Sequence, residues 1–115
     1  MKFSKALKLN HIFRRLYSTS GHANGLLVLY ARKNRSTTNR VGITVSKKLG
    51  GAVVRNRVRR RLREVYRLHE GRFLPGYDIV VVARTRAVDA DFQALTAGYL
   101  SLAEKAGILR PESSL

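Results

Sequence analysis

The chain has 115 residues, 44% of them hydrophobic, which suits a single domain with a packed core. It contains no cysteine, so disulfides and thiol catalysis are excluded, and its longest aliphatic run, residues 79–83, is too short to span a bilayer. The formal net charge of +16 favours a polyanionic partner, nucleic acid before an anionic membrane, and the absence of a secretory signal leads us to expect a cytoplasmic location.

Three elements are predicted in the first part of the chain. Residues 9–18 predict a short helix, because apolar residues recur there at helical spacing. Residues 26–33 predict a strand, and the polar residues 34–39 predict a hairpin loop before a second strand over residues 40–46. Apolar residues alternate with small or polar ones along that second strand, so it should be half-buried. The pattern also leaves room for one short strand near residues 18–22.

The second part of the chain predicts a helix, a strand and a helix. A glycine pair at residues 50–51 precedes the first helix, which covers residues 53–69. The stretch at residues 78–83 (DIVVVA) is apolar at every position after Asp78, as in a central strand covered on both faces. Asp89 or Asp91 can cap the last helix. The order α-β-β-α-β-α predicts an α+β sandwich, in which helices pack on a central mixed sheet.

The helix over residues 53–69 has two distinct faces. At ~100° per residue, four aliphatic side chains fall within ~80° of one another and predict the buried face. These residues are Val54, Val58, Leu62 and Val65. Most of the arginines of this helix fall on the opposite side, where Arg60–Glu64 is the only pair of opposite charges at i,i+4 spacing.

The distribution of charge indicates what the arginine face binds. Residues 1–63 contain 17 basic residues and no carboxylate, whereas residues 64–115 contain 6 basic and 7 acidic residues. Arginine binds phosphate through a planar fork and stacks on bases, and a nearly continuous arginine face suits the nucleic-acid backbone better than base reading. Aromatic side chains in the first helix and first strand either stack single-stranded bases or pack in the core.

No catalytic or metal-binding centre is predicted. The three histidines are scattered and lack a cysteine or carboxylate partner at ligand spacing. Asp89 and Asp91 are explained more simply as helix caps than as a metal pair. If the protein assists cleavage of a phosphodiester bond, the chemistry must lie in a partner.

The order of motifs resembles the protein subunit of bacterial ribonuclease P. The motifs are LKLNHIFRRLY, LLVLY, RVGITVSKKLGGAVVRNRVRRRLREVYR and LPGYDIVVVART, and they cover most of the chain. The resemblance implies one RNA-binding domain over residues 1–115, which assists a catalytic RNA in removing the 5′ leader of precursor tRNA. It also implies a ribosomal protein S5 domain 2-like fold, whose left-handed β-α-β crossover through the arginine helix departs from the usual right-handed rule.

The resemblance assigns two groups of binding residues and no catalytic residue. Those expected to bind the catalytic RNA are Lys47, Lys48, Arg55, Asn56, Arg57, Arg59, Arg60 and Arg63. Those expected to bind the single-stranded leader, in a cleft between the first helix and the sheet, are Phe13, Arg14, Tyr17 and Tyr30. Some relatives have Phe where this chain has Tyr17, a change that keeps the stacking. Magnesium ions are expected on the RNA, and neither a membrane nor a small-molecule substrate is expected.

Three alternatives remain open from the residues. A ribosomal protein would share the small, basic α+β character without taking part in catalysis. The first twenty residues are basic, contain serine and lack acids, as in a transit peptide, although we expect them to be folded and retained because the matched motifs begin within them. An intrinsic nuclease is the third alternative, and it lacks a histidine and carboxylate centre.

Overall fold

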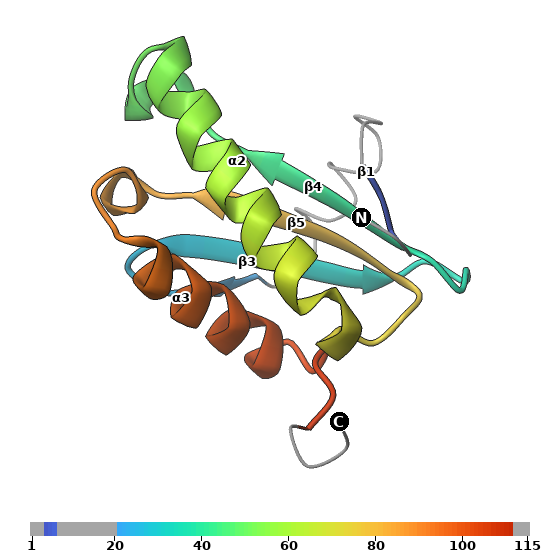
Figure 1. Cartoon of the computed structure of the whole chain (residues 1–115). Helices are drawn as coiled ribbons and strands as arrows, with labels where there is room; N and C mark the ends of the chain where they lie inside the picture. Colours follow the sequence, from blue (N-terminus) through green and yellow to red (C-terminus); the bar gives the residue numbers. More distant parts are fainter. Residues whose placement is uncertain (1–3, 7–20, 112–115) are drawn as a thin grey trace.

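The computed structural model describes residues 21–111 and the backbone of residues 4–6 (Figure 1). The strands are β1 (Ser4–Ala6), β2 (His22–Ala23), β3 (Leu27–Lys33), β4 (Asn39–Thr44) and β5 (Tyr77–Ala83). The helices are α2 (Ala52–His69) and α3 (Phe92–Lys105), with short 3-10 helices at Lys47–Leu49, Glu70–Arg72 and Thr85–Ala87. The helix predicted at residues 9–18 lies outside the described residues.

Five strands form one mixed sheet in the order β1-β4-β5-β3-β2. β4 runs parallel to β1 and β5, while β3 runs antiparallel to β5 and β2. The prediction of a central strand is confirmed, because β5 lies in the middle of the sheet and is buried along most of its length. The additional short strand predicted near residues 18–22 corresponds to β2, whereas β1 was not predicted.

The predicted hairpin between β3 and β4 is wrong. β5 lies between these two strands, so that Val80 is in register with Tyr30 of β3 on one side and with Gly42 of β4 on the other. The reason is burial. β5 is apolar at consecutive positions, and a strand of that kind is most stable when it has a neighbouring strand on each side and both of its faces are covered. Residues 34–38 therefore form a connection that passes the end of β5.

The connection from β4 through α2 to β5 is a left-handed crossover, as expected from the resemblance. The two strands are parallel neighbours, and α2 lies on the viewer's side of the sheet in Figure 1. With both strands turned to point up the page, β5 lies to the left of β4 (Figure 1). Crossovers of this kind are right-handed in nearly all proteins, so this feature is uncommon.

Both described helices pack on the same face of the sheet (Figure 1). α2 buries Val58, Leu62, Val65 and Tyr66, and Val54 is half-buried near its start, which confirms the predicted apolar face. α3 buries Leu95, Tyr99, Leu102 and Ala103. The helices therefore rest on a common core, and the opposite side of α2 faces solvent.

Candidate RNA-binding surface

The outer face of α2 and its two flanks present a group of basic and polar side chains that we call the arginine surface. It consists of Arg55, Asn56, Arg57, Arg59, Arg60 and Arg63. Arg55 and Arg59 are half-buried, while the other four residues are exposed. A hydrogen bond of 2.8 Å from Arg59 Nη1 to Asn56 Oδ1 fixes the spacing of these two side chains. Together with Val53, which is 83% exposed, four of these residues line a shallow depression of about 490 Å³.

The guanidinium groups of the arginine surface have no carboxylate partner within the described part of the chain. The two ion pairs found there are Arg40–Asp78 and Arg67–Glu64. Glu64 does not pair with Arg60, although the two residues are at i,i+4 spacing: Arg67, three residues further along the helix, donates from Nε to Glu64 Oε2 at 3.0 Å. The closely spaced arginines repel one another, and this unbalanced charge favours an external anion.

The ion pair at Glu64 explains why Arg67 does not belong to the arginine surface. The hydrogen bond from Arg67 holds the pKa of Glu64 below its usual value, so the carboxylate remains ionised and offsets the charge of Arg67. Arg61 is also engaged, because its Nη1 donates to the carbonyl oxygen of Ala90 at 2.9 Å and ties α2 to the loop before α3. Neither side chain is as available to a ligand as those of the arginine surface.

Lys47 and Lys48 are both exposed and lie next to the start of α2. They belong to the 3-10 helix Lys47–Leu49, which joins β4 to α2 through Gly50 and Gly51. Gly50 has a φ of 142°, and a Cβ there would lie 3.1 Å from the Val54 side chain, so the turn requires glycine. The two lysines thus extend the basic region beyond the first turn of the helix.

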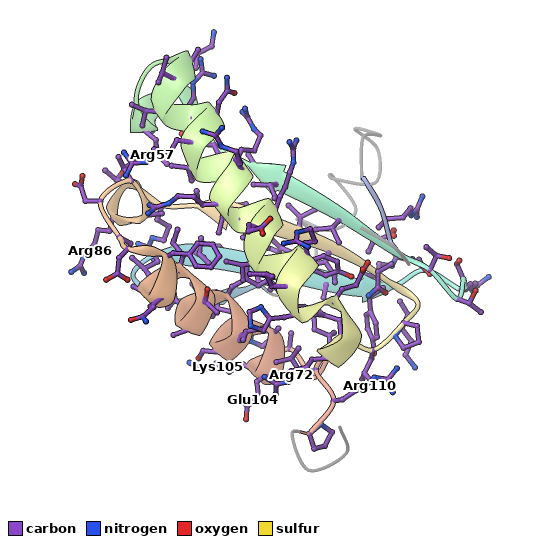
Figure 2. The ribbon with its side chains drawn as sticks, in the orientation of Figure 1. Arg57, Arg72, Arg86, Glu104, Lys105 and Arg110 are labelled. Atoms are coloured by element: carbon purple, nitrogen blue, oxygen red, sulfur yellow. The ribbon has the colours of Figure 1, made fainter. Side chains whose placement is uncertain are left out.

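Basic residues outside α2 lie at both ends of the molecule. Figure 2 shows Arg86 at one end, on the same side as Arg57 of α2, and Arg72, Lys105 and Arg110 at the opposite end. Arg86 belongs to the short 3-10 helix Thr85–Ala87 and is exposed. The arginines are therefore not confined to α2, but α2 carries the largest described group.

The predicted leader-binding residues are described only in part. Phe13, Arg14 and Tyr17 lie outside the described residues. Tyr30 is half-buried in β3, on the face of the sheet opposite α2 and α3, since its neighbours Leu27 and Leu29 are in the core beneath the helices. The backbone of Gly21 lies against this ring: a Cβ at residue 21 would be 2.6 Å from Tyr30 Cε1.

Arg32, which was not among the predicted site residues, shares the face of Tyr30. The two residues are separated by one position on β3, so their side chains point the same way. The signal was present in the sequence, because the alternation that places Tyr30 on this face also places Arg32 there. Arg32 is exposed at the end of the strand.

Residues 4–6 and 21–111 contain neither a cluster of metal ligands nor a helix of membrane-spanning character. No group of three or more histidine, cysteine, aspartate or glutamate side chains capable of holding a metal ion occurs among these residues. None of the helices in the same part of the chain is long and apolar enough to cross a membrane.

Comparison with known proteins identifies the family. The family model described as Ribonuclease P matches residues 1–107. Two relatives are named Ribonuclease P protein component. The one from Clostridium botulinum (strain Langeland / NCTC 10281 / Type F) is 43% identical to this chain over 108 residues, which cover 93% of this chain and 95% of the relative. The one from Clostridioides difficile (strain 630) is 44% identical over 107 residues, which cover 91% of this chain and 94% of the relative. These matches favour the ribonuclease P interpretation over a ribosomal protein.

Solved structures agree with the sequence comparison. The RNase P protein of Staphylococcus aureus superposes with a TM-score of 0.84 at 33% identity, covering 93% of this chain and 99% of that one. The RNase P protein of Thermotoga maritima gives a TM-score of 0.80 at 30% identity, covering 88% and 96%. The sequence, the fold and these relatives lead to the same conclusion: this chain belongs to the ribonuclease P protein family.

Proposed function

We propose that this chain is the protein component of a bacterial ribonuclease P and that its arginine surface, with Lys47 and Lys48, binds the catalytic RNA. The RNA cleaves the phosphodiester bond, and the protein assists removal of the 5′ leader from precursor tRNA. The observation that carries the proposal is the set of guanidinium groups on the outer face of α2, which lack carboxylate partners throughout the described residues. RNA phosphates supply the missing negative charge.

The packing of α2 gives this surface a fixed geometry. Val58, Leu62 and Val65 anchor the inner face of the helix in the core, so the arginine side chains project from a rigid support. Arginines three or four residues apart are displaced by about 5 Å along the helix axis. A rigid row of this kind binds best where phosphates of folded RNA converge, because repulsion between those phosphates is strongest there.

We further propose that Phe13, Arg14, Tyr17 and Tyr30 bind the leader. Aromatic rings stack on unpaired bases regardless of their identity, at about 1–3 kcal/mol per base, which suits leaders of varied sequence. Because mature tRNA has lost the leader, contacts with it strengthen binding of the precursor alone. The partners of the protein are therefore the catalytic RNA and precursor tRNA.

Magnesium belongs to the RNA in this proposal. The described residues do not fit a protein magnesium site, since they contain no cluster of carboxylates or other suitable ligands. The protein acts instead by neutralising phosphates, which lowers the concentration of magnesium that the RNA needs to hold its active geometry. The expected cytoplasmic location is also part of the proposal.

Reconstitution with a bacterial ribonuclease P RNA tests the proposed function. Leader removal is measured over a range of Mg²⁺ concentrations with no protein, with the wild type, and with a variant carrying Arg55→Gln, Arg57→Gln and Arg60→Gln. We expect the wild type to lower the Mg²⁺ requirement and the triple variant to lose most of this advantage. The same Mg²⁺ dependence for both proteins would contradict the proposal.

Two controls complete the experiment. A second triple variant, with Lys33→Gln, Lys105→Gln and Arg110→Gln, removes the same charge from exposed residues outside the arginine surface and is expected to behave like the wild type. When the protein is incubated with precursor tRNA and Mg²⁺ but without the catalytic RNA, we expect no cleavage of the precursor. Cleavage in that sample would support the intrinsic nuclease instead.

A further inference from the structure

Arg32 and Tyr30 occupy neighbouring positions on the face of the sheet opposite α2 and α3. Side chains alternate along a strand, and Leu27 and Leu29 are buried in the core beneath the helices. Tyr30 and Arg32 therefore both point to the other face, and their Cα atoms are separated by about 7 Å along β3. Tyr30 is half-buried and Arg32 is exposed.

The carboxylate nearest to Arg32 in the sheet is already occupied by other groups. In register, Asp78 of β5 lies beside Arg32 on one side and beside Arg40 on the other. Arg40 binds both carboxylate oxygens, with 2.6 Å from Nε to Oδ1 and 2.6 Å from Nη2 to Oδ2, and Asn34 Nδ2 donates to Oδ1 at 3.0 Å. Bidentate pairing of this kind is among the strongest ionic contacts between side chains.

The guanidinium of Arg32 consequently has no counter-ion among residues 21–111. Arg40 and Arg32 flank the same aspartate, but Arg40 is neutralised by it while Arg32 remains available. An unpaired arginine two positions from an aromatic ring offers two complementary contacts to a single nucleic-acid strand. The ring stacks on a base, and the guanidinium binds a phosphate of the adjoining nucleotide.

We propose that Arg32 binds a phosphate of the 5′ leader next to the nucleotide stacked on Tyr30 and so lengthens the stretch of leader that the protein senses. This inference rests on the proposed function of Tyr30. β3 ends on the side of the molecule away from the start of α2 (Figure 1). We place the cleavage site toward the end of β3 that lies nearer the start of α2, so that the leader meets Tyr30 before Arg32 and Arg32 is the contact farther from the cleavage site.

The test uses the holoenzyme reconstituted with a bacterial ribonuclease P RNA. Its affinity is measured for mature tRNA and for precursor tRNAs whose leaders are lengthened one nucleotide at a time. The variants are Arg32→Gln, Arg32→Lys, Lys33→Gln and Tyr30→Ala. Lys33 is the matched control, since it is exposed and adjacent and carries the same charge, but its side chain lies on the other face of β3. Circular dichroism melting confirms that each variant is folded.

Arg32→Gln is expected to weaken binding of long-leader precursors roughly threefold, as for one exposed charge pair, and to leave short-leader precursors and mature tRNA unchanged. The slope of log affinity against log salt should fall by about 0.7 for the long leaders, as for one lost phosphate contact on a single strand. Arg32→Lys should retain most of the affinity, and Lys33→Gln should match the wild type. The effect of Arg32→Gln should begin at a longer leader than the effect of Tyr30→Ala.

The inference is overturned if Arg32→Gln weakens long and short leaders equally, or if Lys33→Gln has the same effect as Arg32→Gln. If Tyr30→Ala shows a leader-dependent loss and Arg32→Gln does not, the role of Arg32 is wrong while the proposed leader site stands. If neither variant shows a leader-dependent loss, both assignments are wrong.

Discussion

Asn39→Ala is expected to lower the free energy of unfolding by about 3 kcal/mol, although the residue lies outside the proposed binding surfaces. Asn39 is 5% exposed. Its Nδ2 donates to Tyr66 Oη at 3.1 Å and to the Leu74 carbonyl oxygen at 3.0 Å, and its Oδ1 accepts from the Tyr77 backbone N–H at 2.8 Å. Each of these three bonds contributes about 1 kcal/mol net, so alanine removes a large part of a typical total stability of 5–15 kcal/mol.

Urea denaturation measures this effect directly. Thr37→Ala, at an exposed residue in the loop before β4, is the control and should change the stability by no more than about 0.5 kcal/mol. If the slope of the unfolding free energy against urea concentration is unchanged, Asn39→Ala alters the stability and not the surface area that unfolding exposes. A loss below about 1 kcal/mol, or a loss equal to that of Thr37→Ala, would refute the reasoning that these bonds join β4 to α2 and β5.

Three further predictions concern separate parts of the chain. Gly21→Ala should weaken binding of precursor tRNA but not of mature tRNA in equilibrium binding assays, because the new Cβ would lie 2.6 Å from Tyr30 Cε1 and displace the ring; an unchanged ratio of the two affinities would argue against it. Phe13→Ala should have the same selective effect in those assays, and equal losses for both RNAs would mean that Phe13 is a core residue. Asp91→Ala should cost about 1 kcal/mol in urea denaturation, since Asp91 Oδ1 accepts from the Ala94 N–H at 2.7 Å; Asp89→Ala should cost less, and similar costs would contradict the assignment of the cap.

The elements with strong apolar patterns could be predicted from the sequence. α2 was predicted at residues 53–69 because its aliphatic residues recur at helical spacing. In the structure it begins one residue earlier, at Ala52. The central position of β5 followed from its consecutive apolar residues. β1 could not be predicted, since Ser4–Ala6 has no pattern of its own and is a strand through its parallel pairing with β4.

The outward direction of the arginines was also predictable, because it follows from the burial of the opposite face. Their ionic partners were not. Glu64 has arginines at suitable spacing both before and after it on the helix, and side-chain geometry selects Arg67 over Arg60. The availability of Arg32 was similarly hidden, since it depends on Asp78 being held by Arg40 from a strand that is distant in sequence.

The salt dependence of binding to the catalytic RNA tests the central claim most directly. Each lost phosphate contact lowers the slope of log affinity against log salt by roughly 0.7–0.9, so the Arg55, Arg57 and Arg60 triple variant is expected to lose about 2–3 units of slope. The control triple variant at Lys33, Lys105 and Arg110 has the same net charge and should keep a slope near that of the wild type. Equal slopes for the two variants would contradict the claim that the arginine surface, and not the total charge of the protein, binds the RNA.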